Sequence, residues 1–374
     1  MGRNKLMIRI YKKIFLSVLF FNAAMLHSQN IAVVGDFENT PVRVDSVAML
    51  VKSWNPDLIV LTGDIFDATA GSTIDTMVGK YYSDYIFPYN GVFGSTATVN
   101  KFYSCIGNHV LNGNGLTQFL DYFTYPGNER YYKVEIGNVS FYIINSNPSE
   151  IDGVADTSVQ GLWLKNELSM ADSNWNIVVF HHPPYTSGAH PSLTYMRWPF
   201  GAWGADVVIN GHNHQYERLS AEGITYFVNG TGGAALYSTY TQIPESQFIY
   251  TECWGAQLVQ PYADSIVFSF YNIRDSLIDR YVIHKNPLSI ENHIKVFSDI
   301  LQNHIEIGFS GINPGNIYNV EVYDIQGRLI KSKQNIKPEN NKLSVSISDL
   351  ISGIYFIKVF DKATHNSAKF IVSR

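Results

Sequence analysis

Five short polar motifs in the first 220 residues carry the kinds of side chain that bind metal ions. Their donor atoms are carboxylate oxygens, an amide oxygen and imidazole nitrogens, with no thiolate among them. Divalent or trivalent metals of hard to borderline character require such donors. Six of the eleven histidines lie between His109 and His214. In chain order the motifs are Gly35-Asp36, Gly63-Asp64-Ile65-Phe66-Asp67, Gly107-Asn108-His109, His181-His182-Pro183-Pro184 and Gly211-His212-Asn213-His214.

Apolar, β-branched runs precede the motifs and predict the strands that position them. These runs are Ile31–Val34, Leu58–Leu61, Ile177–Phe180 and Val207–Ile209. Polar residues that follow such strands lie at their carboxyl ends, where open α/β sheets bind ligands. One motif alone is a weak signal, because a Gly-Asp after a strand is usually a turn. Their order, strand context and number of donors together indicate a two-metal hydrolytic site.

The series resembles the calcineurin-type metallophosphoesterases, and within them the purple acid phosphatases and their short bacterial relatives. The resemblance extends from about Gln29 to His284 and implies a four-layer αββα sandwich, so we expect a catalytic domain at residues 29–286. Five further segments share it: Pro126–Tyr132, Met196–Phe200, Trp203–Asp206, Tyr216–Arg218 and Phe227–Gly233.

The resemblance also implies a ligand set for two divalent or mixed-valence ions of iron, manganese or zinc. Asp64 would bridge both ions. Two such ions can clamp the attacking and leaving oxygens of a displacement and generate hydroxide near neutral pH. The implied activity is hydrolysis of small phosphate monoesters. One ion would be held by Asp64, Asn108, His181 and His212, and the other by Asp36, Asp64, His214 and one further ligand.

Three histidines match positions outside the implied ligand set. His109 matches the family histidine that assists the leaving alcohol, a general-acid role worth about 10²–10⁴-fold in rate. His190 falls where the family places another substrate-side histidine, although an exposed loop histidine is an equal alternative. His182 is expected to support its neighbour His181.

Three positions depart from the family pattern. Purple phosphatases carry a colour-giving tyrosine where this chain has Asp67, and non-purple relatives use a histidine where it has Glu38. We favour Asp67 as the additional ligand, with Glu38 as the alternative. The acidic residue that usually follows the histidine of Asn-His is Val110 here, which removes one means of orienting His109.

The first 28 residues read as a secretory signal peptide, with an uncleaved membrane anchor as the alternative. Five basic residues precede the apolar run Ile14–Leu26, and Ser28 offers a cleavage point. Thirteen apolar residues are too few to span a bilayer comfortably. We therefore expect no transmembrane segment in the mature chain.

Charge argues against a nucleic-acid partner. From residue 29 onward the chain has 22 basic and 32 acidic residues, of which 12 and 24 precede residue 287. A catalytic domain this acidic lacks the basic surface that binds the phosphate backbone of a nucleic acid. The only cysteines, Cys105 and Cys253, could pair after export, but Cys105 sits in an apolar run that favours a buried, inert thiol.

Residues 287–374 predict a small, immunoglobulin-like β-sandwich. Short alternating strands are expected at Ile305–Phe309, Tyr318–Tyr323, Leu329–Ser332, Leu343–Ile347 and Ile354–Val359. The segment resembles the C-terminal sorting domain of the type IX secretion system. This resemblance implies that the type IX machinery is a partner and that the protein is exported through the periplasm to the cell surface or medium. A carbohydrate-binding or spacer module is the alternative. The resemblance is carried by Val322–Ile330, Leu350–Phe356 and Lys369–Val372.

Two other functions remain open for the catalytic domain. A phosphodiesterase or nucleotidase would use the same ligands in a differently shaped pocket. A surface-binding protein with a vestigial site belongs to another class, and the complete set of donor residues argues against it.

Overall fold

The protein divides into two compact units between His284 and Lys285. Its structure is a computed structural model that describes residues 29–37, 41–171, 175–237, 241–285, 295–299, 304–308, 315–339, 342–361 and 365–372. The predicted signal peptide, Glu38 and most of the segment joining the units lie outside these residues. Within the described part, no helix is both long and apolar enough to cross a membrane.

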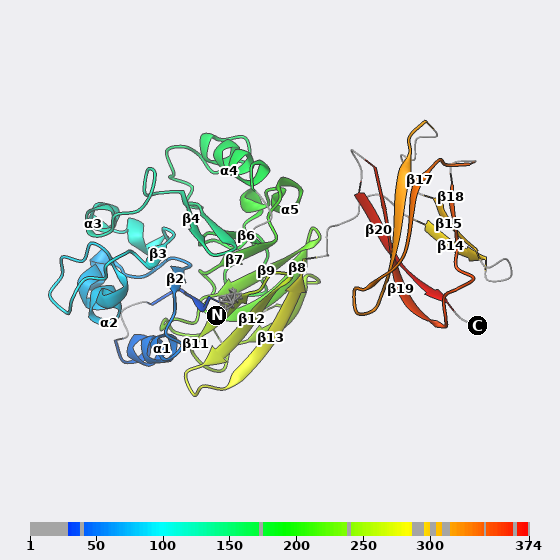
Figure 1. The fold of residues 1–374 in the computed structure, drawn as a ribbon. Helices are drawn as coiled ribbons and strands as arrows, with labels where there is room; N and C mark the ends of the chain where they lie inside the picture. Colours follow the sequence, from blue (N-terminus) through cyan, green and yellow to red (C-terminus); the bar gives the residue numbers. More distant parts are fainter. Residues whose placement is uncertain are drawn as a thin grey trace, which may run out of the picture. The chain divides into compact units, whose positions relative to one another are not determined.

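Two sheets form the larger unit (Figure 1). The first has the order β13-β12-β11-β1-β2-β3, in which β1, β2 and β3 run parallel. Its strands are β1 Ile31–Val34, β2 Leu58–Leu61, β3 Phe102–Ser104, β11 Gly255–Pro261, β12 Ser265–Asn272 and β13 Leu277–His284.

The second sheet has the order β10-β8-β9-β7-β6-β5-β4, with β5, β6, β7 and β9 parallel. Its strands are β4 Tyr132–Ile136, β5 Val139–Ile143, β6 Trp175–Val179, β7 Val207–Asn210, β8 Tyr216–Ala221, β9 Ile224–Asn229 and β10 Ser246–Tyr250. The helices are α1 Pro41–Ser53, α2 Lys80–Tyr82, α3 Gly115–Tyr122, α4 Val159–Ser169 and α5 Phe200–Trp203.

Alternation along the second sheet explains how the layers stack. Side chains of successive strand residues point to opposite faces. Ile177 and Val179 of β6 belong to the core shared with the first sheet, whereas Val178 packs with Leu164 of α4 and Phe200 of α5. Helix α1 covers the other side of the first sheet through Val44, Val47, Ala48 and Val51, one face of a helix. The four-layer αββα fold is thereby confirmed, with α1 and α4 on opposite sides (Figure 1).

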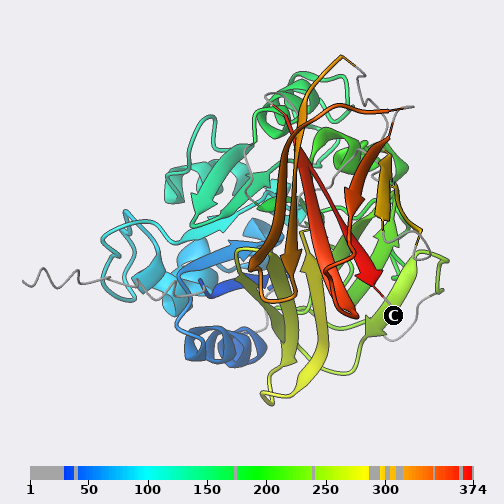
Figure 2. The same cartoon turned by 45° about the vertical axis from the view of Figure 1, so that its right-hand side comes forward.

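The smaller unit is a β-sandwich of a three-stranded sheet, β14-β15-β18, and a four-stranded sheet, β17-β16-β19-β20 (Figure 2). Its core alternates along the strands, as in Val320 and Val322 of β16 and Ile357 and Val359 of β19. The strands are β14 Lys295–Asp299, β15 His304–Gly308, β16 Tyr318–Asp324, β17 Leu329–Ile336, β18 Leu343–Ser346, β19 Gly353–Phe360 and β20 His365–Val372.

Cys105 and Cys253 are both buried and form no disulfide with each other. Burial raises the pKa of the Cys105 thiol well above its usual range, and nearby Asp36 and Asp64 raise it further. Cys105 is thus buried, as expected, and a raised pKa disfavours the reactive thiolate form.

Candidate metal centre

Two buried aspartates lie side by side beyond the ends of neighbouring parallel strands. Asp36 follows β1 and Asp64 follows β2, and the strands pair in register. The two loops hydrogen-bond to each other: the amide of Asp36 donates to Gly63 O at 3.0 Å, and that of Phe37 donates to Asp64 O at 2.9 Å. Parallel pairing therefore brings together two carboxylates 28 positions apart in the sequence.

The second sheet contributes histidines to the same place. His181 follows β6, and His212 and His214 follow β7. The backbone amide of His212 donates to both carboxylate oxygens of Asp36, at 3.0 and 3.1 Å. His214 Nε2 lies 3.8 Å from Asp36 Oδ1. The site thus forms where the carboxyl edges of the two sheets meet.

Backbone carbonyls orient two of these imidazoles. His181 Nδ1 is 2.8 Å from Thr62 O, which directs Nε2 to within 3.0 Å of both Asp64 Oδ2 and Asn108 Oδ1. His214 Nδ1 is 2.9 Å from Ala235 O, so its Nε2 faces Asp36. Metal-binding histidines are commonly fixed in this way by a partner on the opposite ring nitrogen.

Three of the predicted ligands adopt left-handed backbone conformations. The φ angles are 60° at Asp36, 49° at Asp64 and 69° at His212. Such conformations cost about 1–3 kcal/mol each and gather at functional sites, where the surrounding structure enforces them. Close packing also fixes the Asp64 side chain, because a Cβ on Gly107 would lie 2.0 Å from Asp64 Oδ1. The fold maintains a strained arrangement at these donors.

The electrostatics of the cluster suit a bound cation. Burial alone would lower the pKa of His181, but the facing Asp64 carboxylate raises it to about 9. Burial would raise the pKa of Asp64, yet His181 lowers it overall. Without a metal, a proton on His181 balances the buried carboxylate, and metal binding displaces such protons. Burial and neighbouring histidines lower the pKa of His212 to about 2, which leaves its ring neutral and able to ligate.

His109 is held by Asp67, the residue we favoured as an additional ligand. His109 Nδ1 lies 2.9 Å from Asp67 Oδ2, while Nε2 faces the cluster, 3.9 Å from Asp64 Oδ2. Asp67 also accepts hydrogen bonds from Asn112 Nδ2 at 2.7 Å and, through Oδ1, from the amide and hydroxyl of Thr69. Val110 is fully buried. Asp67 thus supplies the orientation that Val110 cannot, through contacts that lie 42 positions apart in the sequence.

The structure brings His190 into the cluster. Its ring stacks on that of His212 with centroids 4.4 Å apart. The buried Asn213 accepts from the amide of His190 at 2.9 Å and donates to its carbonyl at 3.1 Å. His190 is exposed, but these contacts fix its place at the site mouth.

Two neighbouring residues were not expected among the ligands: Tyr237 was not singled out, and His182 was expected only to support His181. Tyr237 stacks on His214, with centroids 4.5 Å apart, and its hydroxyl lies 2.9 Å from His190 Nε2. No local sequence signal marks Tyr237. His182 lies as close to His181 and His212 as a ligand would, although Ser146 Oγ holds its Nδ1 at 2.8 Å.

The donor chemistry fits metal ions. Among the described residues, Asp36, Asp64 and His181 each offer a ligand atom, and these atoms lie within 4.8 Å of one another. All three side chains are buried. The set is oxygen and nitrogen without sulfur, as hard to borderline cations require.

Comparison with known families decides the identity. Residues 27–216 match the calcineurin-like phosphoesterase family, more than half of the chain, and residues 301–373 match the secretion system C-terminal sorting domain. The chain belongs to the calcineurin-like phosphoesterases. Both predicted resemblances are confirmed: the chain contains a calcineurin-like phosphoesterase domain and a C-terminal type IX sorting domain.

Curated relatives point to the purple acid phosphatases. The chain is 29% identical over 243 residues to purple acid phosphatase 15 of Arabidopsis thaliana, covering 54% of this phosphoesterase and 44% of that protein. It is 21% identical over 323 residues to purple acid phosphatase 7 of the same plant, covering 74% of this chain and 94% of that protein. The chain thus spans less than half the length of the first relative.

Solved structures show the same fold. A purple acid phosphatase from yellow lupin seeds superposes with a TM-score of 0.54 at 14% identity, covering 68% of this phosphoesterase and 53% of that chain. GAP50, described as the anchor in the inner membrane complex of Plasmodium, superposes with a TM-score of 0.55 at 17% identity, covering 69% of this chain and 89% of that chain. Since one neighbour is described as an anchor, fold alone does not establish activity.

Proposed function

We propose that this phosphoesterase is exported and hydrolyses small phosphate monoesters at a dinuclear metal site. The observation that carries the proposal is the convergence of buried Asp36, Asp64 and His181, two of them in strained backbone, at one edge of both sheets. Strain maintained at metal-type donors is what a working site requires and what a vestigial site has no reason to keep.

The ligand assignment is the one that the family resemblance implies, and the contacts around Asp64 and Asp36 support it. Asp64 would be shared by the two ions. Asn108, His181 and His212 would complete one site, and Asp36 and His214 would belong to the other. When bound, the ions supply charge neutralisation for the phosphoryl group and activation of water near neutral pH. Iron, manganese and zinc all accept these donors.

His109 donates a proton to the departing oxygen of the ester. Its Nε2 faces the cluster while Nδ1 is held by Asp67, so the ring presents one nitrogen to substrate and keeps the other in a fixed hydrogen bond. Asp67 lies beside this ring, and we propose that it orients His109 instead of completing a metal site. His190, held against His212 by Asn213, lies where it can contact the phosphoryl group.

The charge of the catalytic unit favours a small substrate. The catalytic unit has twice as many acidic as basic residues, so its surface repels extended polyanions, while two cations make the site itself positive. A compact phosphate ester satisfies both conditions. The test is metal analysis of the purified protein together with kcat/KM on matched aryl monoesters, diesters and nucleotides. Two bound ions with a preference for monoesters support the proposal, and a preference for diesters would reverse the substrate assignment.

An anchor without catalysis is the second candidate, favoured by the likeness to GAP50. It predicts metal-free protein and no turnover of any ester. The same purified sample therefore decides between the two functions.

Iron-loaded protein is expected to be colourless. The violet of purple phosphatases requires a phenolate on ferric iron, and position 67 is aspartate here. Visible absorption of the iron-loaded protein measures this directly. Tyr237 is the tyrosine to check, since it stacks on His214. A violet band that disappears in Tyr237→Phe would show that Tyr237 ligates iron and that the ligand set needs revision.

Removing the C-terminal unit is expected to abolish export while leaving catalysis intact. The compact units divide at His284, and the donors of the metal site all precede that residue. A chain ending at His284 should retain wild-type kcat/KM, yet remain in the periplasm of the native host. Cell fractionation measures this, and truncated protein reaching the surface or medium in normal amounts would favour the spacer or carbohydrate-binding alternative.

A further inference from the structure

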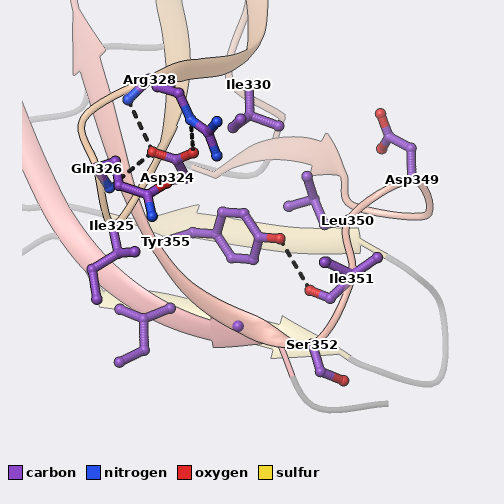
Figure 3. Close-up of a pocket in the computed structure, with 12 residues that line it drawn as sticks. Asp324, Ile325, Gln326, Arg328, Ile330, Asp349, Leu350, Ile351, Ser352 and Tyr355 are labelled. Carbon is purple, nitrogen blue, oxygen red and sulfur yellow. Dashed lines mark hydrogen bonds and ion pairs between the residues drawn. The ribbon is translucent and has the colours of Figure 1, made fainter.

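The C-terminal unit contains a pocket of about 370 Å³ at one end of its four-stranded sheet. Two loops form it (Figure 3): the turn from β16 to β17, and the segment that leads into β19. The lining residues are Asp324, Ile325, Gln326, Arg328, Ile330, Asp349–Tyr355. The pocket lies within the region matched by the sorting-domain family.

All three sequence blocks that resemble sorting domains converge on this end of the sheet. Asp324, in the first block and the last residue of β16, pairs with Tyr355 of the second. Gly353, also in the second block, pairs with Val372, the last residue of the third. Blocks that are separated along the chain therefore share one edge of the fold. The opposite end of the sheet, where β16 begins at Tyr318, contains none of them.

The pocket is preformed by hydrogen bonds. Asp324 Oδ1 accepts from the amides of Gln326 and Arg328, both at 2.9 Å, and Gly327 supplies the positive φ of 77° that the turn requires. On the other side, the Tyr355 hydroxyl donates to Ile351 O at 3.1 Å (Figure 3). Binding there needs little ordering of the loops, which favours affinity.

Exposed aliphatic side chains surround the opening. Ile325 is 66% exposed, Ile330 44% and Ile351 77%. Exposed aliphatic groups gathered around one cavity are typical of a surface that binds another protein. Their contact with a partner's aliphatic side chain would remove this apolar area from water.

The charged and aromatic residues of the pocket indicate which kind of ligand it binds. The two cations near the opening each contact a carboxylate, Arg328 with Asp324 and Lys331 with Asp349, which weakens their attraction for a phosphate or other anion. The aromatic residue in the lining, Tyr355, is 7% exposed and offers no open ring face for a sugar. A neutral, aliphatic peptide segment is the ligand that fits.

We propose that this pocket is where the secretion machinery recognises the sorting domain, by inserting an aliphatic side chain of one of its proteins between Ile325 and Ile351. This rests on the proposed function, in which the C-terminal unit directs export. It identifies which face of the unit makes the contact.

The test uses full-length protein in the native host. Ile325→Asp and Ile351→Asp place a charge at the opening and are expected to reduce the exported fraction about tenfold or more, as expected for central contacts of an interface. Ile351→Ser removes the aliphatic contact without adding a charge and should act in the same direction. An unchanged unfolding temperature of the C-terminal unit in the purified variants establishes that this unit folds, which phosphatase activity cannot do because catalysis does not depend on it.

Ile317→Asp is the matched control. Ile317 is 48% exposed and precedes β16 at its other end, roughly 25 Å away at the usual rise of a strand. Its export should equal that of the wild type. Equal loss in this control, or normal export of folded Ile325→Asp and Ile351→Asp, would overturn the pocket assignment.

Two further outcomes separate the alternatives. Normal export of the chain ending at His284 would refute the sorting function itself, whereas blocked export of that chain with normal export of the pocket variants refutes the pocket alone. Light scattering on the purified protein tests a second copy as occupant. Dimerisation abolished by Ile351→Asp would assign the pocket to self-association and overturn the proposal.

Discussion

Asp64→Ala is expected to lose both metal ions and to reduce kcat/KM by roughly 10³-fold or more, the loss that follows when several kcal/mol of cation stabilisation disappear. The reason is its central place. Asp64 Oδ2 lies 3.0 Å from His181 Nε2, and Oδ1 accepts from the amide of His109 at 2.8 Å. The carboxylate also lies within 4.8 Å of ligand atoms of both Asp36 and His181, which the proposal assigns to different ions.

Metal content by elemental analysis and kcat/KM on an aryl phosphate measure the effect of Asp64→Ala. Asp64→Asn keeps the shape and one acceptor oxygen, so it should retain more metal than the alanine variant while remaining strongly impaired. Asp264→Ala, in an exposed turn between β11 and β12, is the control and should match the wild type. Two bound ions with undiminished activity in Asp64→Ala would refute the bridging assignment.

His109→Ala is expected to keep both ions and to slow hydrolysis by about 10²–10⁴-fold, most for esters with poor leaving groups. A general acid matters most when the departing alkoxide is strongly basic. The structure directs Nε2 of this ring at the cluster, which supports the role. Comparison of kcat for alkyl and activated aryl phosphates measures it, and equal slowing for both classes would argue against proton donation.

Asp67→Asn distinguishes orientation from ligation. If Asp67 orients His109, the variant keeps two ions and shows a weaker form of the same leaving-group dependence. Loss of one ion would establish Asp67 as a ligand. Asp75→Asn is a matched control, because Asp75 also accepts several hydrogen bonds, from Tyr89, Tyr122 and Val92, but is not among the donors of the cluster. It should leave metal content and leaving-group dependence unchanged.

Sequence patterns were sufficient for the elements that place the site. Runs such as Ile31–Val34 and Leu58–Leu61 are strands with the bounds expected, because a buried parallel strand is apolar on both faces. Polar residues directly after such a strand have to lie at its carboxyl end. In the C-terminal unit the same local logic located β15 to β19 but missed β14 and β20. Both are edge strands, but so are β17 and β18, so position at an edge does not explain why these two were missed.

Contacts between distant segments were decided by the tertiary structure. The types and order of residues were sufficient to predict the family and the metal-donor residues, because each motif is a short continuous stretch of sequence. Three contacts depend on which segments the sheets bring together: that of His109 with Asp67, the stacking of Tyr237 on His214, and the meeting of the three sorting blocks at one end of a sheet. A substitution such as Val110 is therefore interpretable only in three dimensions, because a residue 42 positions away can supply the hydrogen bond that it removes.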